Sequence, residues 1–207
     1  MALSYMHLAV ALQTGEGCPW DTGRLLLGAI APDAVHLRET YHPDDKLTSH
    51  LGQRAGKGTD EAILRFVKQY ARGMQRDFVL GYAIHLLTDN LWWDEIFQPF
   101  CQGYTARGGD PEKRSRIYYR DADWFDYSLY QQPQLQAALP ELARAKPEGL
   151  AGLMEAETVG LWRDRCLGFF DGGCEPSEMD YMAWANLEQF LHSAVRKCRA
   201  VFGDSIL

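Results

Sequence analysis

His85 and Asp89 stand four residues apart within an otherwise apolar stretch, FVLGYAIHLLTDNLWWDE, which spans residues 78–95. In a helix this spacing places both side chains on one face, with Cβ atoms roughly 5–6 Å apart, so both could bind one metal ion. A carboxylate buried among Leu, Ile and Trp without a partner would cost several kcal/mol. Asp89 therefore requires a cation, either a metal ion or a nearby Arg or Lys. The alternative is a hydrogen-bonded histidine–aspartate pair in a core that holds no metal.

Further imidazole and carboxylate groups come from other segments. His7 lies in the first apolar stretch, Asp33 follows Pro32, and His50 lies in the polar segment of residues 37–58. Imidazole and carboxylate ligands are typical of catalytic zinc sites, which keep a position open for water and lower its pKa toward about 7. Its own stretch alone favours a different interpretation of Asp33, as a helix N-cap or the first residue of an Asx-turn. His50 by itself fits an exposed histidine.

A weaker candidate comes from the acidic and aromatic segment of residues 111–132. Asp123 and Asp126 differ by three positions, so they share one face of the helix predicted there. Solvated acids are the default interpretation of this pair. Asp123 could instead add a carboxylate to the metal site.

The elements that must position these groups are predicted to be helices. No strand-like alternation extends far enough to count, so the chain is expected to be an all-α, single-domain bundle of about seven or eight helices over residues 1–207. Gly28 is small enough for close approach of another backbone. Ser4, Thr59 and Ser177 are predicted N-caps. The predicted helices are 3–13, 24–31 ending before Pro32, 59–72, 75–97 ending before Pro99, 111–132, 134–145, 149–170 and 177–201, with a loop at 37–58 and a Gly-rich connection at 101–110.

Composition excludes several classes of function. The chain has 207 residues, 46% of them hydrophobic, and a net charge of −7 without a basic stripe, which argues against nucleic-acid binding and attraction to anionic membranes. Five cysteines show no CxxC spacing, and the N-terminus lacks the features of a signal peptide. No apolar run reaches the ~18 residues of a membrane span. A reduced, cytoplasmic protein is expected.

Three stretches resemble the bacterial zinc-dependent phospholipase C family, and more closely its small cytosolic hydrolase branch: LLLGAIAPDAVH at residues 25–36, Ser49–His50, and the stretch with His85 and Asp89. The resemblance covers residues 5–95. It implies a helical fold of the phospholipase C/P1 nuclease type built around zinc. It also implies that His50, His85 and Asp89 bind zinc and that His7 and Asp89 serve a neighbouring zinc. Asp33 would be a ligand or the general base for the attacking water.

The chain departs from the family pattern after Asp89. No HxxxE motif follows, and the only later histidine is His192. One or two zinc ions are therefore expected rather than three. The expected reaction is hydrolysis of a small phosphoester or phospholipid-like substrate by metal-activated water. Two alternatives stay open: a family member that binds a metal or a phosphorylated ligand without turnover, and a helical scaffold without metal. Some aromatic side chains could wall the pocket or simply pack in the core, namely Trp92, Trp93, Trp124 and Tyr119.

Overall fold

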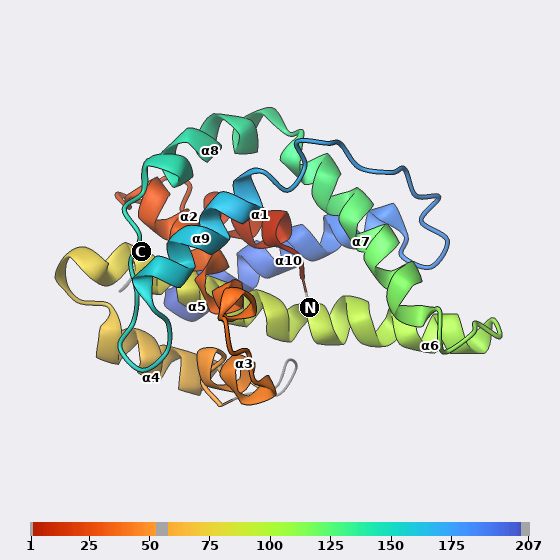
Figure 1. The fold of residues 1–207 in the computed structure, drawn as a ribbon, viewed down its shortest axis with the longest axis horizontal. Coiled ribbons are helices and arrows are strands. Elements are labelled where there is room, and N and C mark those ends of the chain that lie inside the picture. Colours follow the sequence, from red (N-terminus) through yellow and green to blue (C-terminus); the bar gives the residue numbers. More distant parts are fainter. Residues whose placement is uncertain (1, 53–57, 204–207) are drawn as a thin grey trace.

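The computed structural model describes residues 2–52 and 58–203, and every regular element in these ranges is a helix. One isolated bridge joins Leu150 to Met154. The predicted all-α bundle is thus confirmed (Figure 1). The α-helices are α1 (Ser4–Thr14), α2 (Thr22–Ile30), α3 (Pro43–Ser49), α4 (Asp60–Tyr70), α5 (Arg76–Trp92), α6 (Gln98–Ala106), α7 (Arg114–Tyr130), α8 (Pro133–Arg144), α9 (Ala156–Leu167) and α10 (Trp184–Phe202). Shorter segments are the 3-10 helices η1 (Ala31–Leu37) and η2 (Gly73–Gln75) and the π-helix η3 (Trp93–Phe97).

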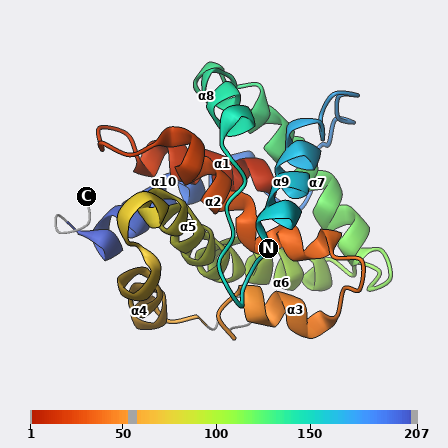
Figure 2. The same ribbon diagram turned by 60° about the vertical axis from the view of Figure 1, so that its left-hand side comes forward.

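Helix α5 forms the centre of the bundle. Its residues from Phe78 to Asp89 are all buried, because apolar side chains cover its whole circumference. It packs against α1, α2, α4 and α10. Figure 1 shows α5 and α6 as one long rod, and in both Figure 1 and Figure 2 the short helices α3 and α4 lie at the edge opposite α8. None of the helices within the described ranges is both long and apolar enough to cross a bilayer.

Two glycines allow α2 and α5 to touch through their backbones. A Cβ atom on Gly28 would lie 2.0 Å from the carbonyl oxygen of Phe78, and one on Gly81 would lie 2.0 Å from the carbonyl oxygen of Leu25. Any larger residue at either position would collide with main-chain atoms. The predicted close approach at Gly28 is confirmed, and it brings the end of α2 against the first half of α5.

The N-terminus of α1 is capped from a distant helix. Ser4 was predicted to be the N-cap, but Leu3 occupies the N-cap position, and its side chain makes no capping hydrogen bond. The carboxylate of Asp126, on α7, accepts hydrogen bonds from the backbone N–H groups of Tyr5 at 2.8 Å and Met6 at 2.7 Å. The interpretation of Asp126 as a solvated acid is therefore wrong. The two hydrogen bonds from the buried Asp126 carboxylate fix the start of α1, which carries His7.

The segment of residues 37–58 is not the continuous loop that was predicted. It contains α3, which begins with a reciprocal cap: the His42 ring accepts from the Asp44 N–H, and the Asp45 carboxylate accepts from the His42 N–H. Pro43 at the first helical position suits this start. A seven-residue helix is too short to show an apolar period, so its pattern gave no signal. Residues 53–57 lie outside the described part of the chain.

Other predicted boundaries also shift. Thr59 caps α4 as predicted, and α2 ends at Ile30, just before Pro32. The helix that was expected to stop before Pro99 continues through η3 and α6 to Ala106. Directly before Pro99 the chain has the π-helical pattern of η3, in which the Gln98 N–H donates to the Trp93 carbonyl, so the α-helical bonding is already interrupted where the proline stands. The Gly-rich connection is correspondingly shorter. The last two helices begin later than predicted, at Ala156 and Trp184, and the Ser177 hydroxyl donates to Asp121 instead of capping a helix.

Candidate metal centre

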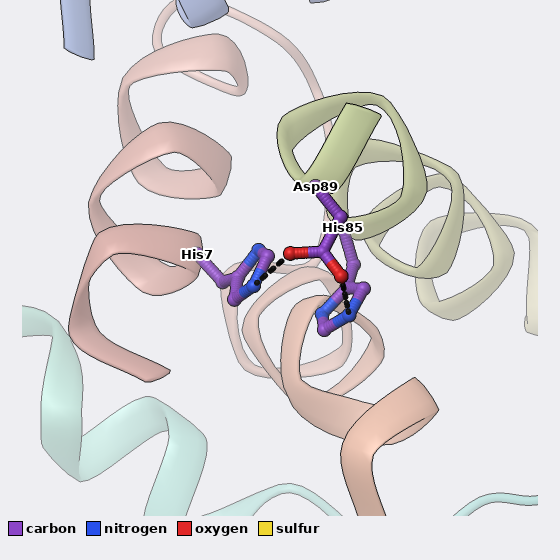
Figure 3. A group of neighbouring side chains, drawn as sticks. All are labelled: His7, His85 and Asp89. Carbon is purple, nitrogen blue, oxygen red and sulfur yellow. Dashed lines mark ion pairs between the residues drawn. The ribbon is translucent and has the colours of Figure 1, made fainter. Parts of the chain in front are cut away.

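Five of the predicted ligands converge from separate elements. His7 comes from α1, Asp33 from η1, His50 from the C-terminal end of α3, and His85 and Asp89 from α5. Their ligand atoms form two groups, His7–His85–Asp89 (Figure 3) and Asp33–His50–His85, and within each group the atoms lie within 4.8 Å of one another. His7, His85 and Asp89 are at most 1% exposed. These buried groups could hold a metal ion.

His85 is held in the tautomer that a metal ligand needs. Its Nδ1 lies 2.8 Å from the carbonyl oxygen of Ala29, which can only accept, so Nδ1 carries the proton. The lone pair of Nε2 therefore points into the cluster, and Nε2 has no hydrogen-bond partner among the described residues. Burial, reinforced by the nearby His7 ring, lowers the pKa of His85 to about 3. The His85 side chain is therefore uncharged at neutral pH, and its Nε2 lone pair is available to bind a metal ion.

His50 is oriented in the same way by its own helix. Its Nδ1 lies 2.9 Å from the carbonyl oxygen of Lys46 and 2.9 Å from the hydroxyl of Ser49. Donation to that carbonyl leaves the Nε2 lone pair facing the cluster. The Tyr82 hydroxyl, on α5, donates to the carbonyl of Ser49 at 2.5 Å and so fixes the end of α3 against the central helix.

The His7 ring stacks on the His85 ring. Their centroids are 3.7 Å apart and the ring planes differ by 12°. Two charged imidazoles at this distance would repel each other strongly in a buried site. Neither nitrogen of His7 has a hydrogen-bond partner in the described part of the chain.

Distances between the ligand atoms favour a metal ion over direct hydrogen bonds. Asp89 Oδ1 lies 3.5 Å from His7 Nε2, and Asp89 Oδ2 lies 3.5 Å from His50 Nε2 and 3.8 Å from His85 Nε2. Hydrogen bonds of this kind are shorter. Ligand bonds of roughly 2.0–2.1 Å in a tetrahedral zinc site place neighbouring ligand atoms roughly 3.3–3.4 Å apart.

The carboxylate of Asp89 meets imidazoles, not an arginine or lysine. All its ion pairs within residues 2–52 and 58–203 involve histidine rings, and its Oδ1 accepts from the Ala2 N–H at 3.2 Å. Its Oδ2 and the Nε2 atoms of His7, His50 and His85 have no hydrogen-bond partner among these residues. Several buried, unpaired lone pairs that face one another would destabilise the fold unless a cation bound there. The residues therefore fit a metal ion.

Asp33 sits where the cluster approaches the surface, and it already has a cationic partner. Its Oδ1 accepts from Lys46 Nζ at 2.8 Å and lies 3.8 Å from His50 Nε2. Burial alone would raise the pKa of Asp33, but Lys46 and the nearby His85 and His50 rings bring it below its usual range. The side chain is 13% exposed. Its bond to a side chain is not the backbone contact that an N-cap or Asx-turn requires.

Asp123 lies in neither ligand group. It lines a separate small cavity of about 130 Å³ between α7, α9 and the start of α1, together with Trp162 and Arg165. Burial raises the pKa of its carboxyl above the usual value. The structure therefore does not bring Asp123 to the candidate ligands.

Sequence reasoning missed two residues beside the centre, Lys46 and His36. Lys46 Nζ lies 3.3 Å from His36 Nε2, and His36 Nε2 lies 3.9 Å from Asp33 Oδ1. A spacing of four residues links Lys46 to His50, but this signal appears only once α3 is known to be a helix. Among the aromatic candidates, Trp92 packs in the core and donates to the Tyr118 hydroxyl.

No family model, curated protein or solved structure matches the chain. The resemblance to zinc-dependent phospholipases C stays a prediction from the motifs, and the candidate metal centre rests on the geometry of its residues.

Proposed function

We propose that the protein is a zinc-dependent hydrolase of phosphoesters, related to the zinc-dependent phospholipase C family. The observation that supports this proposal is the set of buried imidazole and carboxylate lone pairs that face one another without partners. Imidazole and carboxylate ligands suit zinc. The substrate would be a small phosphoester or a phospholipid-like molecule.

The Asp33–His50–His85 group is the better candidate for catalysis. Catalytic zinc sites use three protein ligands and leave one position open, and Asp33 brings this group toward solvent. His85 has one free nitrogen, since Ala29 engages the other, so it can serve only one ion at a time. The chain can thus supply three ligands to one ion, with His7 and Asp89 left for a second. A bound zinc would supply Lewis acidity toward a phosphoryl oxygen and lower the pKa of a water molecule.

In this scheme the side chains of the protein hold the metal ion and orient the attacking water. His50 and His85 present their lone pairs in fixed directions because carbonyl groups hold their protonated nitrogens. Asp33, with its pKa lowered, is a weak proton acceptor, so holding the ion or orienting the attacking water suits it better than general-base catalysis. Hydrolysis adds the hydroxyl of water to phosphorus, breaks the ester P–O bond, and places the proton on the leaving oxygen.

A second function, metal binding without turnover, is favoured by one feature. The His7–His85–Asp89 group is at most 1% exposed, so an ion held there would be shielded from solvent. An ion held only there would stabilise the bundle and meet no substrate.

The test is to measure metal content and hydrolysis together. Purified protein is stripped with a chelator, reloaded with zinc, analysed by elemental mass spectrometry, and assayed on chromogenic phosphomonoesters and phosphodiesters. Zinc at about 1,000 times its Kd should stabilise the fold by about 4 kcal/mol, which corresponds to a rise in Tm of roughly 8–16 °C.

His85→Ala should bind no metal and hydrolyse no substrate while keeping its helical circular dichroism. His192→Ala is the control, since His192 is exposed on α10. Wild-type protein that takes up no metal, or a His85→Ala variant that behaves like wild type, would refute the proposal. Tight metal binding without hydrolysis would favour the second function.

A further inference from the structure

Lys46 brings a positive charge to the edge of the metal centre. It precedes His50 by one helical turn, so both side chains leave α3 on the same face. Its Nζ donates to Asp33 Oδ1 at 2.8 Å and lies 3.3 Å from His36 Nε2. The Lys46 side chain is 21% exposed, whereas that of His85 is 0% exposed. In the described structure, the centre thus approaches solvent on the side of Lys46.

Cationic and aromatic groups continue from Lys46 across the surface. The His36 side chain is 38% exposed, and its ring lies 5.3 Å from Tyr41 and 6.2 Å from Trp162 between centroids. The Arg165 guanidinium stands 5.7 Å from the Trp162 ring. The surface beside Lys46 therefore carries aromatic rings and a second positive charge, that of Arg165.

The charge balance of the centre changes sign when a metal binds. The carboxylates of Asp33 and Asp89 and the ammonium of Lys46 together carry one net negative charge. A dication converts this into one net positive charge, and it draws on the same Asp33 carboxylate that Lys46 holds. An ammonium has three donors, and Lys46 uses at most two of them within the described ranges.

We propose that Lys46 binds a phosphoryl oxygen of the substrate and positions the phosphate over the Asp33–His50–His85 group. Lys46 is then a specificity-determining residue, and the site takes anionic phosphate esters in preference to neutral esters. This inference rests on the proposed function, because the group that receives the phosphate is the proposed catalytic group. The competing explanation is that Lys46 only neutralises Asp33 in the fold.

The experiment measures phosphate binding and metal content in the same samples. Zinc-loaded wild type is titrated with inorganic phosphate by calorimetry, and Lys46→Met and Lys46→Arg are treated identically. Lys46→Met should keep the metal content of the wild type and bind phosphate about 10-fold or more weakly, since a charge-assisted hydrogen bond is lost. Lys46→Arg should stay within a few-fold of wild type because the cation is retained.

Lys113→Met is the matched control. It removes the same charge from an exposed site, where Lys113 pairs with Asp110 3.6 Å away and its side chain is 68% exposed. Its phosphate affinity should equal that of wild type.

Two further titrations separate the possible sources of the phosphate, using bis-p-nitrophenyl phosphate as a soluble ester and vesicles of phosphatidylcholine as a membrane. Binding of either that depends on Lys46 supports the inference. Unchanged phosphate affinity in Lys46→Met would overturn it, as would no phosphate binding by zinc-loaded wild type. Joint loss of metal and phosphate in Lys46→Met would assign Lys46 to holding Asp33, and would also overturn it. Binding that depends on Lys46 without any hydrolysis would leave the inference standing and refute the hydrolase proposal.

Discussion

Substitution of Gly81 by alanine tests whether the contact between α2 and α5 holds the metal centre together. The new Cβ atom would lie 2.0 Å from the Leu25 carbonyl oxygen, about 1.4 Å short of ordinary contact at 3.4 Å. The obstacle is backbone, so no side-chain rotation relieves it, and the two helices must separate. Overpacking typically costs about 1–3 kcal/mol, and the better helix propensity of alanine recovers about 1 kcal/mol or less.

We expect Gly81→Ala to lower the free energy of unfolding by about 2 kcal/mol, which corresponds to a decrease in Tm of roughly 4–8 °C. Separation of the helices would also stretch the 2.8 Å bond between the Ala29 carbonyl and His85 Nδ1. Loss of such a bond to a ligand histidine weakens metal binding about 10-fold or more. Urea unfolding of the metal-free protein and a competition with a chromogenic chelator measure the two effects separately.

Gly103→Ala is the control for this substitution. Gly103 also lies in a helix, α6, but a Cβ atom there would meet nothing within 4 Å. Alanine should therefore stabilise the protein by up to about 1 kcal/mol and leave metal affinity unchanged. If Gly81→Ala proved as stable as Gly103→Ala, with wild-type metal affinity, the close crossing of α2 and α5 would not be what positions His85.

Two further outcomes follow from the buried groups of the centre. Burial and the nearby His7 lower the pKa of His85 to about 3, so the unfolded chain takes up this proton near pH 6.5 and the folded chain only near pH 3. Because only the unfolded chain binds this proton between pH 6.5 and 3, the free energy of unfolding of the metal-free protein should fall by on the order of 5 kcal/mol as the pH drops through this window. Urea titrations of wild type and His85→Gln across the window would show a flatter fall in the variant, and parallel curves would contradict the assignment. Tyr82→Phe removes the donor to the Ser49 carbonyl. It should lower the free energy of unfolding by about 1–3 kcal/mol and weaken metal binding through His50. Urea unfolding and chelator competition would detect the two effects, and unchanged values would show that this bond does not fix α3.

Long helices were predictable because their apolar residues recur over several turns. The stretch around His85 is apolar on every side, so both its helical state and its burial followed from residue types alone. Burial in turn required a partner for Asp89, and the need for that partner predicted a candidate metal site.

Short or irregular elements could not be predicted from the recurrence of apolar residues. Helix α3 depends on a local cap at His42 and not on periodicity, and the π-helix η3 carries the chain past Pro99. The cap of α1 comes from Asp126, which lies more than a hundred residues away in the chain. A carboxylate that satisfies a distant helix end and one that faces water have the same local sequence pattern.

Spacings within single helices were enough to predict the helical class of the bundle and the pairing of His85 with Asp89. The motif resemblance named His7, Asp33 and His50 as ligands, but their meeting with this pair depends on how the helices pack. The same packing keeps Asp123 apart and places Lys46 at the exposed edge. The physical reason is that the elements carrying these residues are placed by the contact of α2 with α5 and by long-range hydrogen bonds such as those of Asp126 and Tyr82. Such contacts join residues far apart in the chain, and no local period records them.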